Sequence, residues 1–367
     1  MNIGIDISQI VYQTGVSRYT VELLKHLLVI DQKNHYFLYA GSLRQKPIIK
    51  SFIKQIKTDK VTSKISNLSP KLADIFWNQL NLPAPNISKK LDVFHSSNWA
   101  IPKTKTNLVT TIHDLTFLKY PKSHLPYYTK AHIRHLDRSK EFSKIIITDS
   151  LSTKKDLVNY GINESKIRVV HLASSSIFKP VKDLNTINQV LDKYNLRKPF
   201  ILSVGTNEPR KNLKRLIQAY QALNLKKTKL VLVGKFGWGE KLQKTKGIKL
   251  LGFVPDQDLK VLYSTAKVFV YPSLYEGFGF PILEALSCGC PVITSNVSSL
   301  PEVGGQAALY INPRSVSSIS KAINTILKIS PPGYQSLVKA SLNQAKKFSW
   351  TKTAKETLKV YQEATTC

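Results

Sequence analysis

The sequence predicts an α/β protein made of two doubly wound, Rossmann-like domains in tandem. Short apolar runs rich in Val and Ile alternate with amphipathic stretches along most of the chain, a pattern typical of parallel sheets covered by helices on both faces. The chain has 367 residues, more than one hydrophobic core usually holds, and its 42% hydrophobic content suits a folded protein. We therefore expect a ligand cleft between the domains, at the carboxyl ends of the strands.

The first half of the chain is expected to alternate strands with helices. Residues 17–29 form the first helix, because Val21, Leu24 and Leu28 recur at helical spacing. Ser152 is typical of a helix start, so another helix is expected at residues 152–160. The expected strands are residues 2–7, 36–40, 93–95, 107–112, 144–148 and 167–171.

The second half repeats the pattern after residues 173–198, whose Ser, Pro and Lys content predicts a linker. The expected strands are residues 200–204, 230–233, 248–251, 268–271 and 292–294, with helices at 213–223 and 259–266. An amphipathic pattern predicts a last helix at residues 349–364. The predicted domains are residues 1–175 and 176–348, followed by a helical tail at 349–367.

The charge of the chain is extreme, at +31 from 54 basic and 23 acidic residues. Nucleic acid, anionic lipid headgroups and a polyanionic substrate are all partners that would suit it. Solvated surface lysines without a partner are the plain alternative. The three cysteines have no metal-ligand spacing, so a reduced, cytoplasmic setting is expected. We expect neither a signal peptide nor a membrane span, because the first residues read as a strand and the apolar runs are short.

Two basic stretches bear on a membrane partner. Residues 46–57 place Ile49 and Phe52 on one helical face, flanked by lysines, which fits either an interfacial helix or an ordinary surface helix packed on the core. Residues 119–144 interleave seven Lys and Arg residues with His and Tyr. This second stretch is suited to phosphate groups of lipid or nucleic acid.

Glu276 and Glu284 frame the most informative motif. An apolar strand precedes them and an apolar helix face follows, so Glu276 is expected on a glycine loop and Glu284 in the first helical turn. Gly277 and Gly279 let the backbone approach a ligand closely. Free N–H groups at a helix start favour an anion, and a carboxylate accepts two adjacent sugar hydroxyls. The motif therefore predicts a site for a polar, phosphorylated ligand.

Arg210 and Lys211 follow another strand of the same domain, just before a helix that Asn212 is expected to cap. An Arg–Lys pair in a basic protein is usually solvated surface. The carboxyl ends of parallel strands lie at one edge of a sheet, however, and these two cations would neutralise a diphosphate held beside Glu276.

Three further motifs are weaker. Gly15 precedes a helix start and could help to hold an anion, although such a glycine is often only a turn. His113 ends a strand on the expected cleft side of the first domain, where a ligand contact and a structural role are about equally plausible. Asp256 and Asp258 are interpreted as helix-capping acids rather than a metal site, so we expect no metal.

The combined motifs resemble the retaining glycosyltransferases of family 4, and most closely their mannosyltransferase-like branch in bacterial surface polysaccharide synthesis. The resemblance spans nearly the whole chain and is strongest from Ser203 to Pro313. The segments that carry it are Val204-Gly-Thr-Asn-Glu-Pro-Arg-Lys-Asn212, Gly252-Phe-Val-Pro-Asp256, Tyr275-Glu-Gly-Phe-Gly-Phe-Pro-Ile-Leu-Glu284 and Ser295-Asn-Val-Ser-Ser-Leu-Pro-Glu-Val303. The segment around Gly15 departs mildly, with one glycine where the family often has two.

The resemblance implies a GT-B fold, with an acceptor-side first domain, a nucleotide-sugar-binding second domain and a C-terminal helix packed on the first domain. It assigns the ribose hydroxyls to Glu284 and the diphosphate to Arg210 and Lys211. It places Glu276 and the backbone of residues 277–279, which include Phe278, at the transferred sugar. Gly15 would lie near the diphosphate, Val254 near the base, and His113 near the sugar and the acceptor. The resemblance implies no metal or other cofactor.

These inferences predict a retaining, metal-independent hexosyltransferase. It would move a hexose, such as mannose from GDP-mannose, to a lipid-linked or polysaccharide acceptor at the inner face of the plasma membrane. A UDP-sugar or dTDP-rhamnose donor is the alternative within the same fold. Outside that fold, the charge would suit a nucleic-acid-binding protein, but that function leaves the two glutamates without a role. An inactive sugar-nucleotide binder is a third hypothesis, which the intact motifs disfavour.

Overall fold

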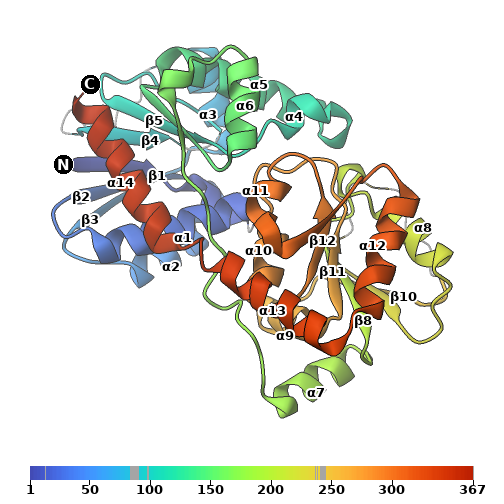
Figure 1. The fold of residues 1–367 in the computed structure, drawn as a ribbon. Helices are drawn as coiled ribbons and strands as arrows, with labels where there is room; N and C mark the ends of the chain where they lie inside the picture. Colours follow the sequence, from blue (N-terminus) through green and yellow to red (C-terminus); the bar gives the residue numbers. More distant parts are fainter. Residues whose placement is uncertain are drawn as a thin grey trace. The chain divides into compact units, whose positions relative to one another are not determined.

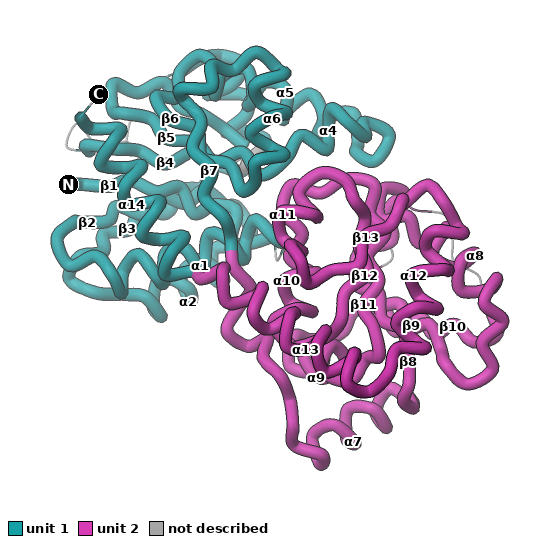
Figure 2. The backbone as a smooth tube through the Cα atoms, viewed as in Figure 1, with its two compact units in different colours: residues 1–172, 350–367 teal, residues 173–349 magenta. Residues whose placement is uncertain are grey.

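The computed structural model describes residues 1–12, 14–82, 91–96, 99–235, 237, 239 and 245–366. It divides into two compact units, shown in teal and magenta in Figure 2. Unit 1 comprises residues 1–172 together with residues 350–367, and unit 2 comprises residues 173–349. The last segment of the chain is therefore part of unit 1.

Unit 1 is built on a seven-stranded parallel sheet, in the order β3-β2-β1-β4-β5-β6-β7. Strand order reverses between β1 and β4, the kind of switch point at which doubly wound sheets bind ligands. The strands are β1 (Asn2–Asp6), β2 (His35–Gly41), β3 (Val61–Ser66), β4 (Val93–Ser96), β5 (Asn107–Ile112), β6 (Ile145–Thr148) and β7 (Ile167–Val169).

The helices of unit 1 include one that comes from the far end of the chain (Figure 1). They are α1 (Gly15–Ile30), α2 (Lys46–Gln55), α3 (Pro70–Ala73), α4 (Thr116–Lys119), α5 (Pro126–Phe142), α6 (Leu151–Asn159) and α14 (Trp350–Thr366), with a π-helix at Asp74–Gln79 and 3-10 turns at Ser8–Tyr12, Pro121–Ser123 and Glu164–Lys166. Helix α14 packs against α1, and its Tyr361 hydroxyl lies 2.7 Å from His95 Nδ1 on β4. The predicted packing of the last helix on the first domain is confirmed.

The burial of helix α2 distinguishes the two interpretations of residues 46–57, an interfacial helix and a surface helix packed on the core. Ile49 and Phe52 are buried, with 0% and 7% of their surfaces exposed. Lys50 and Lys54 are on the exposed side. The apolar face of α2 therefore packs on the core of unit 1 and is not available to a membrane.

Unit 2 contains a six-stranded parallel sheet, in the order β10-β9-β8-β11-β12-β13. The strands are β8 (Phe200–Val204), β9 (Lys229–Val233), β10 (Ile248–Gly252), β11 (Val268–Tyr271), β12 (Val292–Ser295) and β13 (Ala308–Ile311). The helices are α7 (Leu184–Lys193), α8 (Leu213–Ala222), α9 (Asp256–Thr265), α10 (Phe280–Ser287), α11 (Leu300–Gly304), α12 (Val316–Lys328) and α13 (Pro331–Ala345), with 3-10 turns at Pro209–Lys211 and Gly305–Ala307. The α/β fold prediction, with two parallel sheets, is therefore confirmed.

Two local predictions were wrong, and a third was confirmed only in position. The expected linker contains α7, whose Asp183 cap accepts from Thr186 N at 2.8 Å and whose apolar face is buried. Helix α6 is capped by Ser150 rather than Ser152. Asn212 stands at the start of α8, but its side chain donates to the carbonyls of Pro272 and Pro313 instead of capping the helix.

Candidate active site

The main cluster of charged groups lies at the carboxyl ends of two neighbouring strands of unit 2. Arg210 and Lys211 form the 3-10 turn that follows β8 by a short loop. Glu276 follows β11, which pairs directly with β8 in parallel register. The backbone of the two loops is joined as well, because Leu274 N donates to Arg210 O at 2.8 Å. The sheet thus brings together two segments that are 65 residues apart in sequence.

Glu276 bridges both cations. Its Oε2 lies 2.8 Å from Arg210 Nη1, and its Oε1 lies 2.7 Å from Lys211 Nζ. Arg210 Nε also contacts Glu208 Oε2 at 3.0 Å. Sequence reasoning expected the cations to balance a ligand; in this structure they are balanced by Glu276 and Glu208. The cluster is therefore a preassembled group of fixed charges.

Polar neighbours fix the Glu276 carboxylate. The hydroxyls of Tyr271 and Ser273 donate to its Oε1 at 2.9 and 2.6 Å. Burial alone would raise the pKa of Glu276, but Arg210 and Lys211 outweigh it and hold that pKa at about 2. Burial and the repulsion of Arg210 lower the pKa of Lys211, although Glu276 opposes them. Tyr271 and Ser273 were not predicted as site residues. Their positions at and just after the end of β11 could have indicated them.

The glycine loop after Glu276 leads into α10. Gly279 has φ +113°, a conformation that favours glycine, and it stands at the N-cap of α10. The Phe278 side chain is buried against Phe280 and Phe348, with ring centroids 5.7 and 5.9 Å away. The Phe278 side chain thus anchors the loop, which leaves the backbone of residues 277–279 as the part suited to a ligand.

Glu284 has a different environment from Glu276. It is the fifth residue of α10, so it lies beyond the first turn in which sequence reasoning placed it. It is buried, and Tyr263 donates its hydroxyl to Glu284 Oε2 at 3.1 Å. The groups that hold Glu276 thus differ from the Tyr263 hydroxyl that contacts Glu284.

A pocket lies at the carboxyl ends of β8, β9 and β10. Its polar and glycine lining includes Ser203, Gly205, Asn207, Gly234, Lys235 and Gly252. Gly234 has φ +146°, and a Cβ there would meet Gly205 O at 2.0 Å, so the two loops approach too closely for a side chain. Val254, which the resemblance places near the base, is buried two residues after Gly252. Phe236 and Trp238, in the glycine-rich stretch at residues 234–239 that follows β9, lie outside the described residues.

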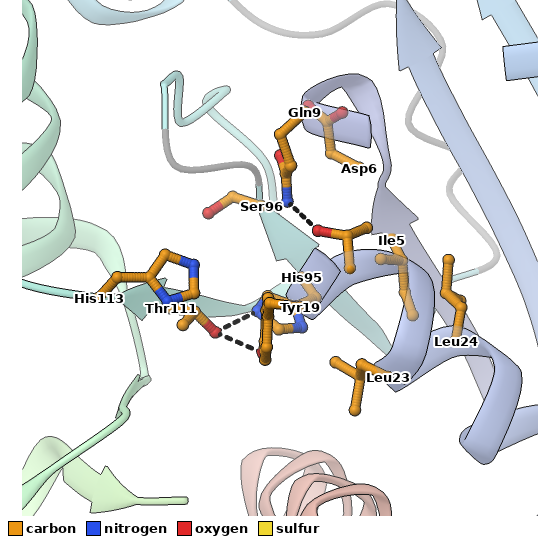
Figure 3. A pocket seen from close by; sticks show the side chains of 11 residues that line it. Ile5, Asp6, Gln9, Tyr19, Leu23, Leu24, His95, Ser96, Thr111 and His113 are labelled. Atoms are coloured by element: carbon orange, nitrogen blue, oxygen red, sulfur yellow. Dashed lines mark hydrogen bonds between the residues drawn. The ribbon is translucent and has the colours of Figure 1, made fainter. Parts of the chain in front are cut away.

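Unit 1 has its own pocket at the switch point of its sheet (Figure 3). Its polar lining consists of Asp6, Gln9, Tyr19, Thr20, His95, Ser96, Thr111 and His113. Of these residues, only His113 was predicted from the sequence. Gly15 is the first residue of α1 and is not among the pocket's lining residues.

His113 is paired with a residue that sequence reasoning did not single out. Its Nδ1 lies 2.7 Å from Asp149 Oδ2. Burial would lower the pKa of His113, but Asp149 raises it above its ordinary value. Asp149 directly follows β6, just as His113 directly follows β5. The strand-end position that pointed to His113 could therefore have pointed to Asp149.

Among the residues that the structure describes, His, Cys, Asp and Glu side chains do not gather into a group that could hold a metal ion. Asp256 and Asp258 lie in the first turn of α9, and Asp258 accepts from Lys193 and Tyr194 at 2.7 Å. Over the same described ranges, every helix is too short or too polar to cross a bilayer.

Comparisons with known proteins add to this geometry. Residues 13–173 match the family described as "Glycosyltransferase Family 4", and residues 188–344 match that described as "Glycosyl transferases group 1". O-antigen chain mannosyltransferase B of Escherichia coli is 35% identical over 380 residues, covering 95% of this chain and 96% of its own. O-antigen chain mannosyltransferase RfbU of Salmonella typhimurium is 29% identical over 276 residues, covering 72% and 73%.

Solved structures share the fold. Anabaena HepE in complex with UDP and glucose aligns with a TM-score of 0.73 at 16% identity, over 99% of this chain and 100% of its own. Sucrose-phosphate synthase from Thermosynechococcus elongatus aligns with a TM-score of 0.72 at 19% identity, over 99% and 98%. The fold and these matches define a glycosyltransferase of the GT-B type. Because a relative matched over nearly its full length is 35% identical, the chain belongs to glycosyltransferase family 4, as the motifs predicted.

Proposed function

We propose that this chain is a retaining mannosyltransferase that moves mannose from GDP-mannose to a growing, lipid-linked surface polysaccharide. The observation that carries the proposal is the Arg210–Glu276–Lys211 cluster at the paired ends of β8 and β11. The choice of sugar is supported by the Escherichia coli relative, whose name gives it as an O-antigen chain mannosyltransferase.

The cluster would bind the donor through its diphosphate. Arg210 offers a planar fork of N–H groups and Lys211 a point charge, two complementary ways to hold phosphate oxygens. Both side chains are about one-tenth exposed, at 14% and 11%, so a ligand would meet them in a largely dry setting. Glu276 keeps both cations in place before the donor arrives, which lowers the cost of organising them during the reaction.

The same charges would assist departure of the leaving group. Cleavage of the anomeric C–O bond leaves negative charge on the diphosphate and positive charge on the sugar. Arg210 and Lys211 would stabilise the first, and the Glu276 carboxylate would stabilise the second. This division of roles needs no metal ion. Because Glu276 is already bound to two cations and two hydroxyls, it is poorly suited to be a nucleophile, which favours attack on the face from which the diphosphate departs.

The remaining proposed roles are those that the family resemblance implies for the predicted residues. Glu284 would accept the ribose hydroxyls, with Tyr263 fixing one of its oxygens. The backbone at residues 277–279 would face the sugar, and the pocket beside Gly252 and Val254 would receive the base. In unit 1, His113 would contact the sugar and the acceptor, and Gly15 the diphosphate. Unit 2 would thus hold most of the nucleotide sugar, whereas unit 1 would serve the acceptor and add the donor contacts of His113 and Gly15.

An anionic membrane surface is the proposed partner of unit 1. Large, exposed apolar side chains lie on or next to α3, the π-helix and the start of α5, and both α3 and α5 pack against the π-helix. They are Leu72, Phe76, Leu80, Leu125, Tyr127 and Tyr128. The exposed Lys71, Lys122 and Lys130 are on or next to the same elements, and Lys71 Nζ lies 5.9 Å from the centre of the Tyr127 ring. This mixture suits the boundary of anionic headgroups at the cytoplasmic face. We name it the α5 surface.

The second basic stretch is only partly available for this purpose. Arg134 pairs with the buried Asp74, and Lys119 Nζ lies 2.7 Å from Asp156 Oδ1. Arg138 is buried and donates to Ile101 O at 3.1 Å. These three cations therefore support the fold of unit 1, and the α5 surface relies on the exposed lysines.

The decisive experiment is a donor panel. The purified chain is incubated with GDP-mannose, UDP-glucose, UDP-galactose and dTDP-rhamnose, and both hydrolysis and thermal stabilisation are measured. We expect GDP-mannose to give the fastest hydrolysis and the largest shift in melting temperature, with the α-anomer of mannose released first. Selective use of another donor would replace the proposed sugar, and no response to any nucleotide sugar would contradict the function.

A further inference from the structure

The pair formed by His113 and Asp149 is built by the register of the unit 1 sheet. Ile112 and Thr148 are partners in the parallel pairing of β5 with β6. His113 and Asp149 are the residues that directly follow them, so the sheet delivers both side chains to one place. His113 Nδ1 and Asp149 Oδ2 are 2.7 Å apart, the length of a charge-assisted hydrogen bond.

The side chains of His113 and Asp149 differ in how accessible they are to a ligand. The Asp149 side chain is 3% exposed, whereas that of His113 is 16% exposed and lines the pocket. A ligand in this pocket would therefore meet the imidazole and not the carboxylate. Nδ1 faces Asp149, so Nε2 is the ring nitrogen left for the ligand.

Burial of the Asp149 carboxylate at this position is unfavourable for the free energy of folding. Its Oδ1 is buried and has no hydrogen-bond partner in the described residues. Burial of an under-satisfied carboxylate opposes folding. The hydrogen bond of Oδ2 to Nδ1 of a pocket-lining imidazole is therefore better explained by an effect on that imidazole than by a contribution to stability.

The other groups around His113 do not provide the charged hydrogen-bond partner that Asp149 provides. The Tyr19 ring meets the His113 ring edge-on, with centroids 4.8 Å apart. His95 is bound to the hydroxyls of Tyr361 and Thr111, and burial lowers its pKa to about 3, so it is neutral. Asp114 adds to the field that raises the pKa of His113. Burial raises the pKa of Asp149, although His113 and His171 act to lower it.

We propose that Asp149 is a positioning residue for His113, which it orients through Nδ1 and keeps protonated at Nε2. His113 then meets a hydroxyl of the transferred sugar or the acceptor as a hydrogen-bond donor and not as a base. The pair as a whole is neutral, so it supplies this donor without adding net positive charge beside the cation-like sugar. The proposal rests on the proposed glycosyl transfer for its substrate.

The first test needs no substrate. The imidazole nitrogens of the full-length, 15N-labelled chain are followed by NMR against pH, with His113→Gln used to assign the signal. We expect His113 to hold both protons at pH 7 and to titrate above the ordinary value of about 6.5. Asp149→Asn should lower that midpoint, whereas Asp137→Asn, a matched carboxylate of unit 1 that accepts from Tyr160 at 2.6 Å, should not. A wild-type midpoint at or below 6.5, or one that Asp149→Asn leaves unchanged, would overturn the proposal.

The second test uses transfer kinetics of the same variants. Asp149→Asn should lower kcat by about 10- to 100-fold, with little change in donor KM, and should move the alkaline fall in rate to lower pH. The double variant with His113→Gln should be no slower than His113→Gln alone, because Asp149 acts through His113. Additive losses in the double variant would show that Asp149 acts independently, which contradicts the proposal.

The two tests separate the possible failures. If the wild-type chain transfers no sugar, the proposed function fails, while the NMR titration still decides whether Asp149 sets the protonation of His113. If transfer is observed but the titration of His113 is insensitive to Asp149, the positioning role fails and the function stands. Asparagine has nearly the shape of aspartate, and a melting curve of each variant excludes loss of folding as the cause.

Discussion

Arg210 and Glu276 form an ion pair, with 2.8 Å between Nη1 and Oε2, across the ends of two neighbouring parallel strands. Lys211 completes the cluster at 2.7 Å from the other carboxylate oxygen. Each cation is thus held in place by a carboxylate that the sequence places 65 or 66 residues away. Local contacts alone would not give this geometry; the pairing of β8 with β11 does.

Substitution of Arg210 by Ala should lower kcat by about 100- to 1,000-fold, because one of two charges on the leaving diphosphate is lost. The affinity for GDP should fall while that for GMP, which lacks the β-phosphate, changes little. Arg210→Lys should recover only part of the rate, since it keeps the charge but not the planar fork. These constants are measured by steady-state kinetics and calorimetry.

Arg197→Ala is the matched control for that variant, because Arg197 is 77% exposed and pairs with Asp192 on the surface of unit 2. It should leave both kcat and the GDP affinity unchanged. An Arg210→Ala enzyme with wild-type turnover would remove Arg210 from the proposed site.

Glu276→Gln should change how stability depends on pH. The folded-state pKa of Glu276 is about 2, below its ordinary 4.5, so its contribution is fully present above about pH 4.5 and is lost as the pH falls toward 2. The advantage of wild type over Glu276→Gln in the free energy of unfolding should therefore shrink by about 2 kcal/mol between pH 6 and pH 3. Urea unfolding at both pH values measures it.

Glu164→Gln provides the comparison, because Glu164 is an exposed carboxylate of unit 1 that pairs with Lys154. Its pH-dependent difference should be much smaller, since solvent screens an exposed pair. If the advantage of wild type over Glu276→Gln were the same at both pH values, the two cations would not be holding Glu276 in its charged form.

Glu284→Gln should abolish discrimination at the ribose of the donor. In the wild-type chain, GDP should bind about 10-fold or more tightly than 2′-deoxy-GDP, because the carboxylate accepts the 2′-hydroxyl. In Glu284→Gln the two ligands should bind about equally. Tyr263→Phe, which removes the hydroxyl 3.1 Å from Glu284 Oε2, should weaken this preference only in part. Retention of the full preference by Glu284→Gln would move the ribose away from Glu284.

The fold was predictable because its signals are local. Buried parallel strands such as Val268–Tyr271 are continuous apolar runs, and their strand ends carry the motif residues. The edge strand Val61–Ser66 escaped prediction because most of its side chains are exposed and polar. Helix α7 escaped because polar residues alternate with its buried Ile187, Val190 and Leu191 in a stretch that also resembles a linker.

The site was only partly predictable. Arg210, Lys211 and Glu276 could be brought together in advance, because strand ends of one parallel sheet meet at one edge. The sequence could not show that Glu276 pairs with Arg210 and Lys211 and neutralises their charges, because this depends on side-chain directions that the sequence does not determine. Asp149 could have been listed as a strand-end residue, but its pairing with His113 could not be predicted, because only the register of β5 with β6 brings the two side chains together.

Binding to anionic vesicles should depend on the α5 surface and not on α2. At low salt, the wild-type chain should co-sediment with vesicles that contain phosphatidylglycerol, and binding should weaken as salt screens the headgroups. Lys122→Glu with Lys130→Glu should greatly reduce binding, as should Leu125→Ser with Tyr127→Ser. Lys50→Glu with Lys54→Glu makes the same charge change on α2, whose apolar face is buried, and should reduce binding much less. Equal losses from the two charge reversals would mean that net charge alone drives attraction, and absence of wild-type binding at low salt would exclude the membrane as a partner of this surface.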